Sequence, residues 1–179
     1  MADGTHAVLK DHDGRWALCF ERPLAHPPEC VWQALTSAGE LRDWHPTPFE
    51  LEPRRGGRVS YLPGEGMAQL PQGTVLEFEP PRLLAHTWGE DQLRWELRPD
   101  AGGCVLCLTH IFDGRFKAAR DGAGWHLCLR ALSSALEADP RPQRGEGSHL
   151  PSEWNQLNRE YEQRFAIAPE QATPPPSSQ

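Results

Sequence analysis

The chain places many strand-like segments one after another, with no helical segment between them. Six short segments combine apolar or alternating side chains with flanking Gly or Pro, at residues 49–52, 58–62, 73–79, 83–88, 92–98 and 104–112. An earlier segment, residues 15–21, alternates in the same way, with Trp16, Leu18 and Phe20 on one side. Strands that follow one another directly pair antiparallel. The sequence therefore predicts an antiparallel sheet of six to seven strands.

Two other regions carry helical spacing. The first begins at about Pro28 and is interrupted near Gly39, before a short second turn that ends at Trp44. The second forms one apolar stripe at spacings of three, four and seven, made of Trp125, Cys128, Leu129, Leu132 and Leu136. A stripe of this kind lies against a sheet. We therefore expect an α+β core in which an antiparallel sheet grips one long helix.

The C-terminal part divides into three segments. Residues 141–151 are rich in Gly and Pro and predict a linker after a single domain at residues 1–140. Residues 152–166 predict an extra helix packed on that domain, since one side carries Trp154, Leu157, Tyr161 and Phe165. Residues 167–179 contain a Pro- and Ser-rich tail that is expected to be disordered, because it cannot bury enough apolar surface.

Composition limits the partners and the location. The 25 acidic residues exceed the 18 basic residues and give a formal charge of −7, which opposes binding to nucleic acid. The sequence has no apolar stretch of membrane-spanning length and no signal-peptide pattern, so a cytoplasmic protein without membrane insertion is expected. Five cysteines at irregular spacings do not form a disulfide framework.

Several short motifs occur in an ordered series along the chain. They are VWQALT at residues 31–36, LRDW at 41–44, GTV at 73–75, PPRLL at 80–84, TW at 87–88, LTH at 108–110 and GW at 124–125. In order and spacing they resemble the activator of Hsp90 ATPase homologue 1-like group of the START-like, or helix-grip, superfamily. The resemblance extends from about Trp16 to Leu136. It implies a curved antiparallel sheet wrapped around the long C-terminal helix, with two short helices after the first strand.

The implied fold also predicts a site. A curved sheet and a long helix meet at their edges and leave an apolar hollow at the centre. The residues expected to line it are Trp44, His45, Tyr61, His86, Trp88, Trp95, Leu108, His110 and Trp125. Packing is the competing interpretation for the indoles, above all for Trp125, because an indole buries a large area. Trp44 and His45 precede a proline and are expected at the mouth of the hollow.

The two strand histidines are the sharpest polar candidates. His86 shares a strand face with Leu84 and Trp88, and His110 shares one with Leu108. Both imidazoles are therefore expected to face inward, where burial keeps them neutral and able to orient a ligand carbonyl or hydroxyl. The alternative is a histidine satisfied by a backbone carbonyl or water, or turned outward by a bulge.

Other chemistries have less support. The eight histidines include no HxH or HxxxH pair, so no metal site is expected, and no cofactor-binding loop appears. No GxSxG-type elbow is present for a nucleophile. The superfamily resemblance allows a polyketide cyclase- or dehydratase-like enzyme, for which His86, His110, Arg94 and Glu77 are the polar residues of interest. Of these, Arg94 is expected on the solvated face, opposite Leu93 and Trp95. Resemblance of fold does not establish such chemistry.

The sequence is compatible with three functions. The preferred one is a binding protein for a small hydrophobic or amphipathic molecule, with catalysis uncertain and not favoured. The second is the cyclase-like enzyme, which requires two ionisable groups that converge on the hollow. The third is a stress-related, co-chaperone-type interaction protein, which requires an exposed apolar patch, and residues 154–165 are the candidate. The same helix is also a candidate contact for a homodimer.

Overall fold

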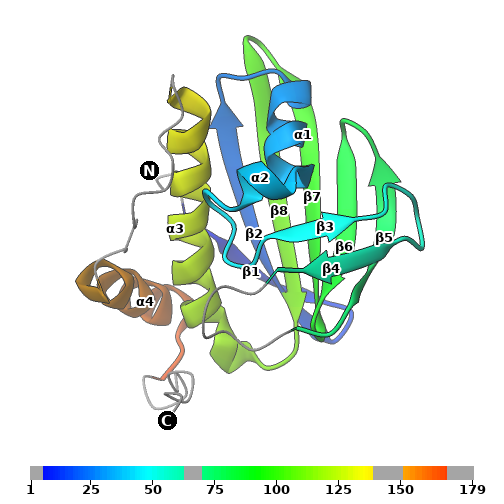
Figure 1. The fold of residues 1–179 in the computed structure, drawn as a ribbon. Coiled ribbons are helices and arrows are strands. Elements are labelled where there is room, and N and C mark those ends of the chain that lie inside the picture. The colour runs from blue at the N-terminus through cyan, green and yellow to red at the C-terminus, as the bar shows by residue number, and fades with distance from the viewer. Residues whose placement is uncertain (1–5, 63–69, 139–150, 169–179) are drawn as a thin grey trace.

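The structure is a computed structural model that describes residues 6–62, 70–138 and 151–168. One antiparallel sheet dominates it, with the strand order β1-β2-β8-β7-β6-β5-β4-β3 (Figure 1). The strands are β1 (Val8–His12), β2 (Arg15–Leu24), β3 (Phe49–Leu51), β4 (Arg58–Tyr61), β5 (Gly73–Glu79), β6 (Leu83–Trp88), β7 (Asp91–Asp100) and β8 (Gly103–Phe112). The helices are α1 (Pro28–Thr36), α2 (Ala38–Leu41), the 3-10 turn η1 (Arg115–Lys117), α3 (Ala118–Glu137) and α4 (Pro151–Phe165).

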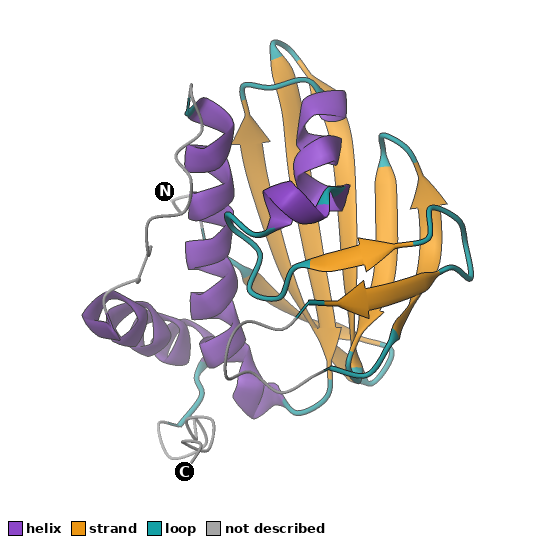
Figure 2. Ribbon diagram, in the orientation of Figure 1, coloured by secondary structure: helices purple, strands orange, loops and turns teal. Residues whose placement is uncertain are grey.

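The expected α+β helix-grip fold is confirmed, with its antiparallel sheet and its long C-terminal helix. Figure 2 shows α1 and α2 in front of the central strands and α3 along one side of them. The centre of the sheet is the long pairing of β8 with β2 and β7, where Leu108 lies opposite both Phe20 and Trp95. These side chains share the inner face, because residues directly opposite each other on paired strands point to the same side of the sheet. All three are buried, so the core lies between this face and the helices.

The described residues form eight strands, whereas the sequence predicted six to seven. The additional strand, β1, pairs with β2 through a hairpin whose two central residues are Asp13 and Gly14. Both have positive φ, 53° and 84°, which is the backbone of a type I′ hairpin turn. β1 was not predicted, because it is a short edge strand whose side chains are mostly exposed and include charged ones. The Asp-Gly pair between the two strands was the available signal.

The segment after α2 folds back onto α1. Pro28 begins α1, where its fixed φ suits the first helical turn. The Trp44 indole then donates a hydrogen bond to the Ala34 carbonyl at 3.0 Å, which anchors the chain that leaves α2. This turn leads into β3, which runs across the front of the central strands in Figure 1. As a result Phe49 of β3 lies over His86 of β6, with 4.8 Å between the ring centroids.

Helix α4 packs on α3. Its apolar stripe is buried at Leu157, Tyr161 and Phe165, and the Tyr161 ring faces Gly122 of α3. The Tyr161 hydroxyl accepts a hydrogen bond from the Ala7 N–H at 3.1 Å and also bonds His126 at 3.1 Å. One side chain thus joins the start of β1, α3 and α4. Most of the expected linker at 141–151 and of the expected tail at 167–179 lies outside the described residues.

Candidate functional site

The inner face of the sheet carries a continuous cluster of aromatic rings. Of the nine residues that the sequence predicted for the hollow, eight belong to this cluster, and the ninth, Leu108, lies opposite Trp95 on the same face. Eight of the nine are at most 3% exposed, and Trp88 is half-buried. Their elements are α2's C-terminal turn (Trp44, His45), β4 (Tyr61), β6 (His86, Trp88), β7 (Trp95), β8 (Leu108, His110) and α3 (Trp125). Phe49 and Phe112 join the cluster and were not nominated, although both alternate correctly for the inner face.

His45 is the centre of this cluster. Its ring lies 5.2 Å from Trp44, 5.4 Å from Phe49 and 5.4 Å from Trp125, measured between centroids. Trp95 and Trp88 follow at 6.1 and 6.4 Å. Side chains therefore occupy the space around His45. Trp44 and His45 are buried at 2% and 0% exposure rather than placed at a mouth, because the Trp44 bond to α1 pulls this turn inward.

His45 has one partner and one unpaired nitrogen. Its Nδ1 accepts a hydrogen bond from the Thr47 N–H at 3.1 Å, so the proton of the neutral ring is on Nε2. Nε2 is buried and has no hydrogen-bond partner. Burial, together with the nearby His86, lowers the pKa of His45 to about 3, against the bond from Thr47. His45 is therefore neutral at physiological pH and presents an unsatisfied N–H donor.

His86 has the complementary arrangement. Its Nδ1 lies 3.1 Å from the Thr87 carbonyl oxygen, which can only accept, so Nδ1 carries the proton and Nε2 is left as an acceptor. Nε2 is also buried without a partner. The Tyr61 hydroxyl donates to the same carbonyl. Burial lowers the pKa of His86 to about 4, and the bond to Thr87 opposes this.

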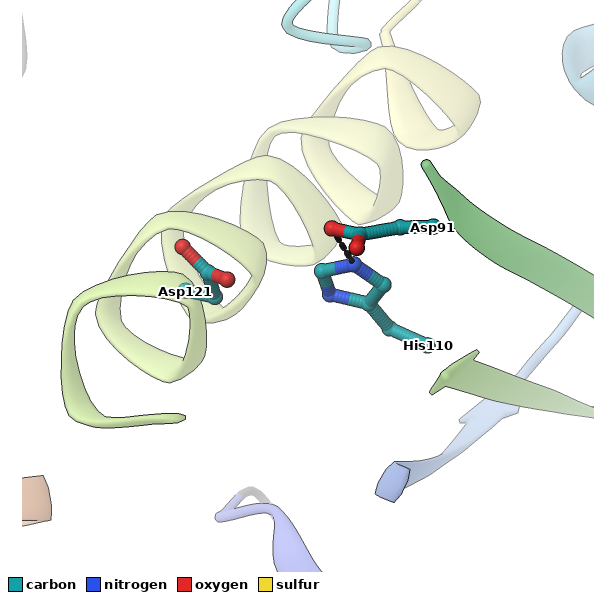
Figure 3. Close-up of side chains that lie close together, drawn as sticks. All are labelled: Asp91, His110 and Asp121. Atoms are coloured by element: carbon teal, nitrogen blue, oxygen red, sulfur yellow. Dashed lines mark hydrogen bonds and ion pairs between the residues drawn. The ribbon is translucent and has the colours of Figure 1, made fainter. Parts of the chain in front are cut away.

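His110 is fully engaged. Its Nδ1 accepts from the Trp125 indole N–H at 3.1 Å, and its Nε2 therefore donates to an Asp91 carboxylate oxygen at 3.0 Å. Figure 3 shows Asp91 and His110 reaching toward each other, with Asp121 of α3 beside them. Burial alone would raise the pKa of Asp91. The bond from His110 and the charge of Lys117 at 3.4 Å outweigh burial and lower it.

Within the described residues, Asp91, His110 and Asp121 form one group whose ligand atoms all lie within 4.8 Å of one another. These are residue types that bind divalent metals. Each is already partnered, however. Both nitrogens of His110 are used, Lys117 neutralises Asp91, and Arg120 donates to Asp121 at 2.8 Å. The group is therefore a neutralised hydrogen-bonded network, and a metal would have to displace two cations and break a hydrogen bond.

An open groove borders the aromatic cluster. We call it the indole groove; it encloses about 310 Å³ and is lined by Pro46, Trp88, Arg120, Asp121, Gly124, Trp125, Cys128 and Trp154. Trp88 comes from the end of β6, Trp154 from α4, and most of the remainder from α3. Three indoles make its walls mainly apolar, while Arg120 and Asp121 add a polar rim. The groove therefore lies between the sheet and the long helix, and α4 contributes one wall.

Sequence reasoning found only two lining residues of the indole groove, Trp88 and Trp125. The α3 residues Asp121, Gly124 and Cys128 were missed, although they lie three or four positions from Trp125 or from each other and so share a helix face. That spacing was the available signal. Trp154 gave no such signal, because its place in the wall depends on how α4 docks.

A larger hollow of about 490 Å³ lies on the outer face of the sheet. Its floor includes the small side chains Ala17, Cys19 and Ala85, which alternate with core residues. Arg94 and Glu77, two residues of interest for catalysis, lie here and pair with each other. They are thus on the opposite face from the histidines, because Arg94 alternates with the buried Leu93 and Trp95.

Comparison with known families identifies the region that carries these features. Residues 25–137 match the sequence profile of the family described as activator of Hsp90 ATPase homolog 1-like protein. The match begins just before α1 and ends with α3, so it includes every residue of the aromatic cluster. No curated protein matches the chain at a significant level. No helix in the described residues is both long and apolar enough to cross a membrane.

Solved structures share the fold. A conserved protein of unknown function from Enterococcus faecalis is 17% identical with a TM-score of 0.69, over 90% of this chain and 92% of that one. CalU16 from Micromonospora echinospora, solved by NMR, is 20% identical with a TM-score of 0.69, over 97% and 100%. A Rhodobacter sphaeroides protein is 28% identical with a TM-score of 0.55, over 73% and 97%.

Proposed function

The chain belongs to the family of activator of Hsp90 ATPase homolog 1-like proteins, and we propose that it binds a small apolar or amphipathic molecule in the indole groove. One observation carries this proposal. Three indole side chains from three separate elements, Trp88, Trp125 and Trp154, wall one open space of about 310 Å³. Ligand sites are concave and mostly apolar, with a few placed polar groups, and the groove has this character.

The polar rim determines how a ligand would be oriented. Arg120 and Asp121 line the groove at the first turn of α3 and pair with each other at 2.8 Å. They are part-exposed, with side-chain exposures of 35% and 13%, so they can contact the solvated end of a ligand. The indoles would then hold its apolar end. An amphipathic molecule fits this arrangement better than a wholly polar one.

The charged side chains that line the indole groove, Arg120 and Asp121, pair with each other, which does not favour the enzyme alternative. A cyclase-like reaction needs ionisable groups that can exchange a proton with a ligand. His110 is 0% exposed and both of its nitrogens are engaged, by Trp125 and Asp91. It could act only after Trp125 moved. We therefore propose binding without turnover.

The interaction-protein alternative loses most of its candidate surface. The apolar stripe of α4 is buried at Leu157, Tyr161 and Phe165, against α3 and the chain near Ala7. Of the predicted stripe, only Trp154 remains half-buried at an open surface, where it lines the indole groove.

The proposal is tested by titrating the protein with tetralin, an apolar bicyclic probe, and following tryptophan fluorescence and thermal stability. Trp154→Ala should lower tetralin affinity roughly tenfold, since losing about 50 Å² of apolar contact corresponds to about 1.3 kcal/mol. Trp32→Ala is the matched control, because Trp32 is half-buried against Phe78 and outside the groove. Absence of binding to the unaltered protein, or equal losses in both variants, would contradict the proposal.

A further inference from the structure

Two unsatisfied N–H donors belong to neighbouring rings, and one of these rings, Trp88, lines the indole groove. One is Nε2–H of His45, whose ring is 0% exposed and whose other nitrogen is engaged by Thr47. The other is the indole N–H of Trp88, which is buried and has no partner. The two rings lie 6.4 Å apart, centroid to centroid. A buried N–H without an acceptor costs free energy, so two of them side by side require an explanation.

The indoles between the groove and His45 differ in how they are held. Trp125 contacts His45 at 5.4 Å and is fixed by its bond to His110, which is itself fixed by Asp91. Trp88 contacts both Trp125 and His45 and has no hydrogen bond through its indole. Rotation of Trp88 therefore breaks no hydrogen bond of its indole. Trp125 is thus held by a hydrogen bond that Trp88 lacks.

We propose that Trp88 is a gate between the indole groove and a polar subsite, in which Nε2–H of His45 and the indole N–H of Trp88 bind a carbonyl oxygen of an uncharged ligand. A carbonyl oxygen has two lone pairs and no proton, so it satisfies two donors at once. This inference rests on the proposed function, because the ligand reaches the subsite through the groove.

The surroundings select an uncharged carbonyl over a carboxylate or an ammonium group. The rings of Trp44, Phe49, Trp95 and Trp125 surround His45, and a charge placed among them would lose its hydration without an opposite charge to compensate. His45 cannot supply that charge, since burial keeps its ring neutral. An ammonium group has no acceptor, so it could not accept a hydrogen bond from either N–H. Ketones, quinones, esters and amides remain.

The experiment compares 1-tetralone with tetralin, which has the same bicyclic skeleton without the carbonyl. His45→Asn keeps an acceptor at the position of Nδ1 for the Thr47 N–H and removes Nε2. His45→Gln keeps a donor near the position of Nε2. We expect His45→Asn to weaken 1-tetralone about tenfold and tetralin less than twofold, with His45→Gln close to the unaltered protein for both. Trp88→Phe should likewise weaken 1-tetralone selectively.

Two results distinguish failure of the polar subsite from failure of the groove proposal. If tetralin binds in the groove and the ratio of the two affinities stays constant across the variants, the polar subsite is wrong and the groove proposal stands. If neither probe binds the unaltered protein, both proposals fail. Should the His45 variants not fold, the unaltered protein still decides by NMR. The His45 Nε2–H and Trp88 indole N–H protons must move downfield with 1-tetralone and not with tetralin, and no movement overturns the inference.

Discussion

At the scale of single residues, the indoles of the cluster differ in how their N–H groups are held. Trp44 donates to the Ala34 carbonyl, and Trp125 donates to His110. Trp88 has no acceptor for its indole N–H. A hydrogen bond stabilises the fold mainly because leaving its buried partner unpaired is costly. Replacing each indole by a phenyl ring should therefore have different consequences at these positions.

Trp125→Phe should lower the free energy of unfolding by about 1–3 kcal/mol more than the loss of ring area alone, because it leaves Nδ1 of His110 buried and unpaired. Trp88→Phe removes a donor that had no partner. The free energy of unfolding should therefore fall only by the amount that the lost ring area accounts for. Urea denaturation of both variants measures the difference. Equal losses would show that anchorage does not distinguish the two indoles.

At the scale of elements, the approach of α3 to α4 is set by a glycine. A Cβ at position 122 would lie 3.2 Å from the Tyr161 ring, a contact tight enough that the ring would have to shift. A Cβ at position 124, half a turn further along the same helix, would have no neighbour within 4 Å. Close packing at Gly122 is what lets the Tyr161 hydroxyl reach the Ala7 N–H and His126.

Two alanine substitutions test this contact. Gly124→Ala should stabilise the protein by about 0.5–1 kcal/mol, because alanine favours the interior of a helix over glycine. Gly122→Ala gains the same helical preference but presses on Tyr161, so it should be less stable than Gly124→Ala by about 1 kcal/mol or more. Thermal denaturation of the two variants gives the order. The reverse order would mean that α4 is not closely packed on α3.

Elements were also the scale at which the sequence was most informative. The alternation in β6 and β8 placed His86 and His110 on the inner face, and the stripe of α3 placed Trp125 against the sheet. The sequence pattern did not predict the hydrogen-bond partners of these residues. Nothing local to His110 indicates Asp91, which comes from the neighbouring strand, or shows that the nitrogens of His45 and His86 are unpaired. The groove wall at Trp154 depends on helix docking, which periodicity does not encode.

At the scale of the whole molecule, three neutral histidines tie stability to pH. Burial lowers the pKa of His45 to about 3, and of His86 and His126 to about 4, from 6.5. Between those values and 6.5 the unfolded chain binds more protons than the folded one, so the free energy of unfolding rises with pH. This contribution is complete above about pH 6.5 and is lost as the pH falls toward 4 and 3.

The free energy of unfolding should therefore decrease steadily between pH 6.5 and pH 4, before most carboxylates are protonated. His86→Gln should reduce this slope, because glutamine has no charged form to bury and the unfolded chain then binds one proton fewer at acid pH. His12→Gln, on the exposed end of β1, is the control and should leave the slope unchanged.

Urea denaturation at half-unit pH intervals measures all three proteins. An unchanged slope in His86→Gln would show that His86 does not contribute to it. A flat profile in the unaltered protein would contradict the neutral, buried state of the histidines on which the carbonyl subsite depends.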